Sequence, residues 1–351
     1  MKDWLVENAA PVIRYRTMTE LVHVSNNKLL QETMDALLAL PQVQKRLNLL
    51  NNLDYKRTHG SNSTCLENVL PMLNDFGLYY GTEKFRQNTM NIADVSEIVL
   101  DDDYDKIIAY PFLLRSKFPI DGLLDFVTQR INTIYDFTRH MDYDIYDNET
   151  DYKGVPASFR GRPIVKPTVS HRLPLIYDIV AFAEVYERVS PNMQAKIDNI
   201  IQYIIAPEYD IVEPMYGIQC FMQRRDNFST GWSYSEPLRA SQWKYYAMGW
   251  DCKKPFNDNK GYSNPNLHRL MLYSCFPTAV KSMWFQNAIG YLTQYKTSDG
   301  TYIFPKEYLP EYDSNWILGS RMSLAENRRK KNWREIESTF YMLKILNSQN
   351  S

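Results

Sequence analysis

The chain has 351 residues, enough to bury a large hydrophobic core, and its 40 Lys and Arg residues balance 41 Asp and Glu residues. This balance excludes the broad electrostatic attraction by which basic proteins bind nucleic acid or anionic membranes. The four cysteines are scattered without a Cys-x-x-Cys pair, which argues against a disulfide framework and a zinc knuckle. We therefore expect no nucleic acid partner, no metal ion and no other cofactor.

The N-terminal residues do not have the pattern of a signal peptide, because Asp3 and Glu7 interrupt what would be its basic and apolar regions. No run of residues approaches the ~18 apolar residues of a membrane-spanning helix. We therefore expect a cytoplasmic protein without a membrane span. The length favours one domain over residues 1–351.

Helical patterns recur along the chain, whereas the alternation typical of strands is scarce. The first clear helix has a capping box, Thr64 and Glu67, and Gly77 as its C-terminal stop. Ser190 and Pro191 begin another helix. Further apolar stripes have helical spacing: Leu124, Val127, Ile131 and Ile134; Leu175, Ile179, Phe182 and Tyr186; Ile197, Ile200, Ile201 and Ile204; Trp333, Ile336, Phe340 and Leu343. This succession of helices predicts an all-α fold.

A helix that runs into a polar turn, residues 284–302, is the most informative stretch. The helix leads into Asp299-Gly300-Thr301-Tyr302, a turn that ends on an aromatic residue. Its apolar arc is wider than a surface helix needs, which predicts burial on two sides. Two neighbouring stripes form this arc: Trp284, Ala288, Tyr291 and Tyr295 in one, and Phe285, Ile289 and Leu292 in the other.

This helix and turn resemble the repeat of terpenoid cyclases and protein prenyltransferases, in which a helix and a Gln precede Asp-Gly-x-Trp. Lys296 stands in place of the Gln, and Tyr302 in place of the Trp. Other segments resemble uncharacterised bacterial proteins of that superfamily, namely residues 4–7, 11–17, 245–251, 324–329 and 335–343. The resemblance implies an α/α toroid, a double ring of antiparallel helices in which the two chain ends meet.

The catalytic motifs of the better-known relatives do not occur in the sequence. There is no Asp-x-Asp-Asp run to protonate an alkene. The zinc set of prenyltransferases is also missing, because Asp251 and Cys252 have the wrong spacing and His268 does not complete the set. The resemblance therefore implies a fold and leaves the catalytic residues unassigned.

Two segments lack helical periodicity, residues 140–172 and 206–263, and we expect them to form ordered loops over one end of the ring. The aromatic content of 14% supports a cavity with aromatic walls. We expect its mouth to be lined by Trp232, Tyr245 and Trp250. An anionic group of the ligand would be held at the rim by Arg160, Arg162, His171 and Arg172, unless they form only a hydrated basic loop.

The acidic run of residues 101–105, Asp-Asp-Asp-Tyr-Asp, fits the Asp-Asp-x-x-Asp motif by which class I terpene synthases hold Mg²⁺. A solvated turn after a helix is the interpretation that we favour, and both are left open. A second charged cluster lies near the C-terminus, and we expect it to tie the last helix to the first: Glu326, Arg328, Arg329, Glu335 and Glu337.

Three functions remain open at this point. The first is a toroid that binds an isoprenoid or another amphipathic, lipid-like small molecule in an aromatic central cavity, with or without catalysis. The second is a carbohydrate-active helical ring, a glycosidase or lyase, with Asp226, Glu236 and Asp251 as its carboxylates. The third is a non-catalytic scaffold that binds another protein.

Overall fold

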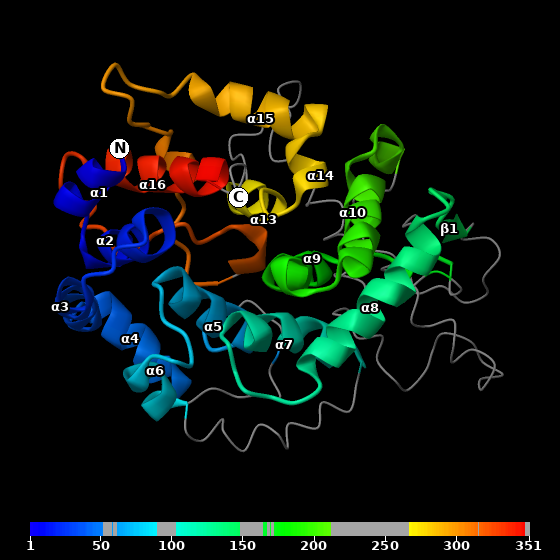
Figure 1. Ribbon diagram of the computed structural model, residues 1–351, viewed down its shortest axis with the longest axis horizontal. Coiled ribbons are helices and arrows are strands. Elements are labelled where there is room, and N and C mark those ends of the chain that lie inside the picture. Colours follow the sequence, from blue (N-terminus) through cyan, green and yellow to red (C-terminus); the bar gives the residue numbers. More distant parts are fainter. Residues whose placement is uncertain are drawn as a thin grey trace, which may run out of the picture. The chain divides into compact units, whose positions relative to one another are not determined.

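The computed structural model describes residues 1–51, 58, 62–89, 103–147, 164–166, 169, 172–211, 267–314 and 316–347. They belong to two compact units: unit 1 is Met1–Leu123 with Pro255–Ser351, and unit 2 is Leu124–Lys254. Most regular structure in these residues is helical (Figure 1), which confirms the all-α class. The single domain over residues 1–351 stays a prediction.

Unit 1 begins with helices that pack each on the next along the chain, from α1 to α5. The last helix, α16 (Trp333–Asn347), packs against α1, α2 and α13 (Figure 1), and Lys2 Nζ donates to Asn347 Oδ1 over 3.4 Å. The two ends of the chain therefore meet, as expected. The helices of unit 1 are α1 (Lys2–Asn8), α2 (Pro11–Thr17), α3 (Asn27–Leu38), α4 (Pro41–Leu50), α5 (Leu66–Asp75), α6 (Glu83–Asn88), α7 (Asp103–Arg115), α13 (Leu267–Tyr273), α14 (Pro277–Val280), α15 (Met283–Thr293) and α16, with a π-helical turn at Met18–Val22 after α2 and short 3-10 turns at Lys306–Tyr308 and Trp316–Leu318.

The most buried helix of the N-terminal half is α5, in which residues 66–74 all lie out of solvent. The expected stop at Gly77 is confirmed: its φ is 81°, a value that glycine adopts without strain, and the N–H of Leu78 returns to Leu73 O. The capping box is wrong by one residue. The N-cap is Cys65, whose side chain does not cap the helix, and Thr64 N instead bonds Asn62 Oδ1.

The turn at residues 299–302 connects α15 to α16. Thr301 Oγ1 donates to Glu335 Oε1 over 2.6 Å, and Tyr302 N donates to Thr339 Oγ1 over 2.9 Å. Tyr302 is buried, so the turn anchors an aromatic residue against α16. The expected burial of α15 on two sides is wrong, because its buried residues, Phe285, Ala288, Ile289 and Leu292, form one face, and Trp284 and Tyr295 are half-buried at its edges.

Unit 2 is built on α9, whose residues Ile176–Phe182 are all buried. Arg130 of α8 and Asp178 of α9 form a buried bidentate pair, with Nε–Oδ1 of 2.9 Å and Nη2–Oδ2 of 2.7 Å. The N-cap at Ser190 is confirmed, since Ser190 Oγ accepts from Met193 N. In α8, Leu124 is exposed rather than part of the buried stripe. The elements of unit 2 are α8 (Leu123–Thr138), β1 (Tyr146–Asp147), β2 (Ile164–Val165), α9 (Ile176–Val185), α10 (Pro191–Ile205) and 3-10 turns at Tyr186–Arg188 and Pro207–Ile211.

The two segments expected to be irregular contain some regular structure. In the first, β1 and β2 pair in antiparallel register, Tyr146 with Val165 and Asp147 with Ile164. In the second, a 3-10 turn covers Pro207–Ile211. The expectation that these two segments cover one end of a ring of helices stays a prediction. Among the described helices, none combines the length and the apolar character that a membrane crossing requires.

Candidate anion-binding site

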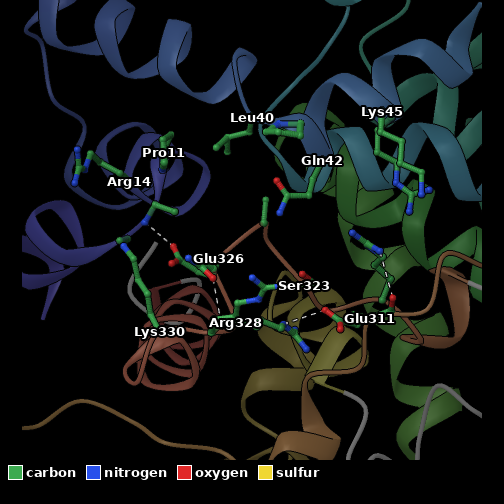
Figure 2. Close-up of a pocket in the computed structure, with 18 of the residues that line it drawn as sticks. Pro11, Arg14, Leu40, Gln42, Lys45, Glu311, Ser323, Glu326, Arg328 and Lys330 are labelled. Carbon is green, nitrogen blue, oxygen red and sulfur yellow. Dashed lines mark hydrogen bonds and ion pairs between the residues drawn. The ribbon is translucent and has the colours of Figure 1, made fainter.

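A pocket of about 900 Å³ lies in unit 1 between the start of α2, the start of α4 and residues 311–330. Figure 2 shows Pro11, Leu40 and Gln42 on one side of it and Glu326 and Arg328 on the other. Its lining carries seven Lys and Arg side chains against three Asp and Glu, so the potential inside it is positive. The basic residues are Arg14, Lys45, Arg46, Arg321, Arg328, Arg329 and Lys330, and the acidic ones are Glu311, Asp313 and Glu326.

Arg46 is the most buried cation of this pocket, with a relative exposure of 3%. It lies on α4 between Val43 and Leu47, which are both buried, so a charge interrupts the apolar face of the helix. Its Nη2 bonds Asp313 Oδ1, whereas its buried Nη1 has no hydrogen-bond partner among the described residues. A buried guanidinium nitrogen without an acceptor is costly, which indicates that an acceptor belongs there.

One carboxylate serves three cations at this place. Asp313 Oδ1 accepts from both Arg46 and Arg321, and Lys45 Nζ lies 3.6 Å from Asp313 Oδ2. Burial lowers the pKa of Arg321, and the charge of Arg46 lowers it further. Arg321 Nε is also buried and, within the described segments, has no acceptor. The group therefore has a deficit of negative charge, which a bound anion would correct.

The N-terminus of α4 adds to this preference for an anion. Leu40 is its N-cap and provides no side-chain hydrogen bond, and Pro41 follows as the first helical residue. The first N–H groups of a helix have no partner within the helix, and its dipole favours negative charge there. Because Leu40, Pro41 and Gln42 line the pocket, the start of α4 borders the same space as Arg46.

Glu326 provides the opposite wall. Its Oε1 accepts from Ala10 N over 2.6 Å, while its buried Oε2 has no hydrogen-bond partner in the part of the chain that the structure describes. Burial raises the pKa of Glu326 to about 7, although the Ala10 hydrogen bond, Lys330 and Arg14 oppose the rise. The preceding residue, Ala325, has a φ of 61°, in the left-handed region. That conformation costs an alanine about 1–2 kcal/mol, and it turns Glu326 toward Ala10.

Arg328 connects the segment that carries Glu326 to helix α16. Its Nη2 bonds Glu337 Oε2 over 2.8 Å, its Nη1 donates to Leu309 O, and its guanidinium lies 4.4 Å from the ring centre of Trp333. Glu337 also accepts from Leu324 N over 3.0 Å. The segment that carries Glu326 is thus fixed from behind, and the pocket does not depend on exposed, mobile side chains alone.

One of the expected site residues, Arg172, is among the described residues, and it does not line this pocket. Arg172 belongs to unit 2, where its guanidinium lies 5.6 Å from the ring centre of Phe137. The others lie outside the described residues, so their roles stay predictions: Trp232, Tyr245, Trp250, Arg160, Arg162 and His171. None of the described residues that line this pocket is aromatic.

Of the acidic run at residues 101–105, only residues 103–105 are described. Helix α7 begins at Asp103, so the second half of the run at residues 101–105 is helical rather than a turn, in keeping with the preference for acidic residues in a first turn.

His268 is buried in unit 1, and its ring centre lies 4.1 Å from that of Trp316. Burial lowers its pKa well below the usual value, and Arg269 and Arg115 add to this. His268 is therefore neutral at physiological pH.

The C-terminal charged cluster behaves only partly as expected. Glu326 does reach the start of α2, but Arg328 pairs with Glu337 and Glu335 bonds Thr301, all within the C-terminal part.

Three residues of the pocket were not predicted from the sequence: Arg46, Arg321 and Asp313. A charge on the apolar face of α4 was the signal that could have found Arg46. In the described segments, no group of three His, Cys, Asp or Glu residues is arranged to hold a metal ion.

Comparison with protein-family models, with curated proteins and with solved structures finds no match to this chain.

Proposed function

We propose that unit 1 binds a small molecule with a phosphate or carboxylate group in the pocket at the N-terminus of α4. The observation that carries the proposal is the buried guanidinium of Arg46, whose Nη1 lacks an acceptor in the described part of the chain. A planar guanidinium next to helical N–H groups matches the oxygen atoms of these anions. The charge deficit around Asp313 supports the same class of ligand.

The proposal retains the anionic half of the ligand that the sequence suggests and gives it a different anchor, Arg46 and Arg321 in place of the basic loop. We also propose that the helices form the α/α toroid of the terpenoid cyclase and prenyltransferase superfamily. The packing of α1 to α5 in sequence and the return of α16 to α1 support that arrangement. Binding of an isoprenoid by Trp232, Tyr245 and Trp250 stays a separate prediction, made from the sequence alone.

Isothermal titration calorimetry with sulfate, citrate, pyrophosphate and geranyl diphosphate tests the proposal. We expect at least one of these anions to bind and Arg46→Gln to weaken it about tenfold or more, because a charge-assisted hydrogen bond is worth about 1.5–3 kcal/mol. The matched control is Lys28→Gln, since Lys28 is an exposed cation of α3 away from the pocket. Equal affinities of wild type and Arg46→Gln, or no binding of any probe, would refute the proposal.

A further inference from the structure

The two oxygen atoms of Glu326 have different surroundings. Oε1 is occupied by the N–H of Ala10 at 2.6 Å. Oε2 is buried and, in the described segments, without a partner, although the residue lines the pocket and is 97% buried by its relative exposure of 3%. A buried oxygen without a donor or acceptor is destabilising, so this atom is expected to have a partner in the functional state.

The charges around Glu326 limit what that partner can be. Arg14 of α2 and Lys330 lower the pKa of Glu326 by their positive charge, whereas Glu337 of α16, itself paired with Arg328, interacts with Glu326 as a like charge. An ionised Glu326 next to a bound anion would repel it in a partly dry site. A neutral Glu326 would instead present an O–H donor at Oε2, because Oε1 already accepts from Ala10.

Its environment makes the neutral form accessible. Burial raises the pKa of Glu326 to about 7, so that both the neutral and the ionised form are accessible near neutral pH before any ligand arrives. A second negative charge within hydrogen-bond distance raises a carboxyl pKa further. Binding of the anion would therefore complete the protonation.

We infer that Glu326 binds the ligand as a neutral acid: Oε2 donates a hydrogen bond to an oxygen of the anion, and where Glu326 was ionised before binding, it takes up one proton from water when a fully ionised anion binds. The inference rests on the proposed function and specifies it. The proton remains on Oε2, no covalent bond of the ligand changes, and hydroxide is left in the solvent. The ligand class is then an oxyanion that accepts one hydrogen bond from Glu326 and lies in the pocket that Arg46 and Arg321 also line.

The test is the pH dependence of the affinity for sulfate and citrate, measured by calorimetry in wild type and Glu326→Gln. For wild type we expect the affinity to fall about tenfold per pH unit above pH ~7, because one proton binds with the anion. For Glu326→Gln we expect no such fall, and an affinity within about threefold of wild type at pH ~6, because the amide NH₂ can donate in place of the acid. The difference between the two proteins cancels the titration of the probe itself.

A control distinguishes Glu326 from other carboxyl groups. Glu32→Gln removes an exposed acid of α3 that does not line the pocket, and it should keep the wild-type pH dependence. If an anion binds with the same pH dependence in wild type and Glu326→Gln, the inference is wrong and the proposed function stands. If neither sulfate, citrate, pyrophosphate nor geranyl diphosphate binds to wild type, the proposed function fails, and the inference fails with it.

Discussion

Glu326 Oε1 accepts a hydrogen bond of 2.6 Å from the backbone N–H of Ala10, a residue 316 positions earlier in the chain. The bond joins the loop before α2 to the segment before α16, and both line the same pocket. The packing of α16 against α1 and α2 brings these segments together. The pocket therefore forms only when the two ends of the chain have met.

The Ala10–Glu326 bond predicts different effects for two substitutions. Glu326→Ala leaves the part-buried N–H of Ala10 without an acceptor, which should lower the free energy of unfolding by about 1–3 kcal/mol. Glu326→Gln keeps a carbonyl oxygen at the position of Oε1 and should change it by less than about 1 kcal/mol. Urea unfolding at pH ~7 measures both. Equal losses for the two variants would show that the hydrogen bond is not the cause.

The pH dependence of stability follows from Glu326 and Glu337, because burial raises the pKa of each to about 7. A carboxyl group whose pKa is higher in the folded state holds its proton more tightly there, so its contribution is present below the unfolded pKa and is lost as pH rises through the folded one. We expect the free energy of unfolding to decrease between about pH 4.5 and pH 7, by at most about 3 kcal/mol per group. Thermal or urea unfolding across this range should show a smaller decrease in Glu326→Gln.

The ion pair of Arg16 and Glu20 makes the free energy of unfolding depend on pH in the opposite direction, so that stability falls as the pH falls. Arg16 Nε and Nη2 bond Glu20 at 2.7 and 3.0 Å, and Lys344 Nζ lies 2.9 Å from Glu20 Oε2. Despite its burial, these cations lower the pKa of Glu20 to about 2. Stability from this group is complete above about pH 4.5 and is lost as pH falls toward 2.

Substitution of Arg16 tests the same cluster. Arg16 also donates to Asp75 O and lies over the ring of Phe340, so that it connects α2, α5 and α16. Arg16→Met should lower the free energy of unfolding by about 3–5 kcal/mol, because it removes one partner of a buried ion pair. The comparison is Lys28→Met, whose exposed pair with Glu32 should contribute less than about 1 kcal/mol. A similar change in both variants would contradict this assignment.

The local parts of the fold were predictable from the sequence because their causes are local. Ser190 caps its helix, and Gly77 ends α5 with a positive φ, since each acts within a few residues. Thr64 was wrong as a cap because the helix begins at Leu66, with Cys65 as its N-cap. The apolar pattern at residues 284–295 predicted the helix correctly but not how many of its faces are buried, because the burial depends on which other elements pack against the helix.

The pocket was much less predictable. Its walls come from α4 and from a segment some 270 residues later, and the closest ion pair, Arg46 with Asp313, spans 267 positions. Composition suggested no anion site, because the whole chain is nearly neutral while the pocket is not. A single charged residue on the apolar face of α4 identifies Arg46 as unusual, but its partner depends on the tertiary fold.

The expected absence of a metal ion has a direct test. Cys and His residues are not clustered in the sequence, so we expect the circular dichroism spectrum and the melting temperature to be unchanged in excess chelator. Elemental analysis that finds about one zinc per chain, lost together with stability, would show the interpretation of Asp251, Cys252 and His268 to be wrong.

The last prediction separates the anionic and the apolar halves of the ligand. Arg46→Gln should weaken pyrophosphate and geranyl diphosphate by the same factor, because the two probes share the group that Arg46 would bind. Trp250→Ala should weaken geranyl diphosphate alone, by about 2 kcal/mol or more if its indole anchors the isoprenoid tail, as buried Trp residues at binding sites do. Asp102→Ala should change neither affinity, because we favour a structural role for the acidic run. Calorimetry of the three variants with both probes tests these expectations. Equal affinities of wild type and Trp250→Ala for geranyl diphosphate would contradict the predicted aromatic cavity. A loss of affinity confined to geranyl diphosphate in Arg46→Gln would contradict an anion site at α4.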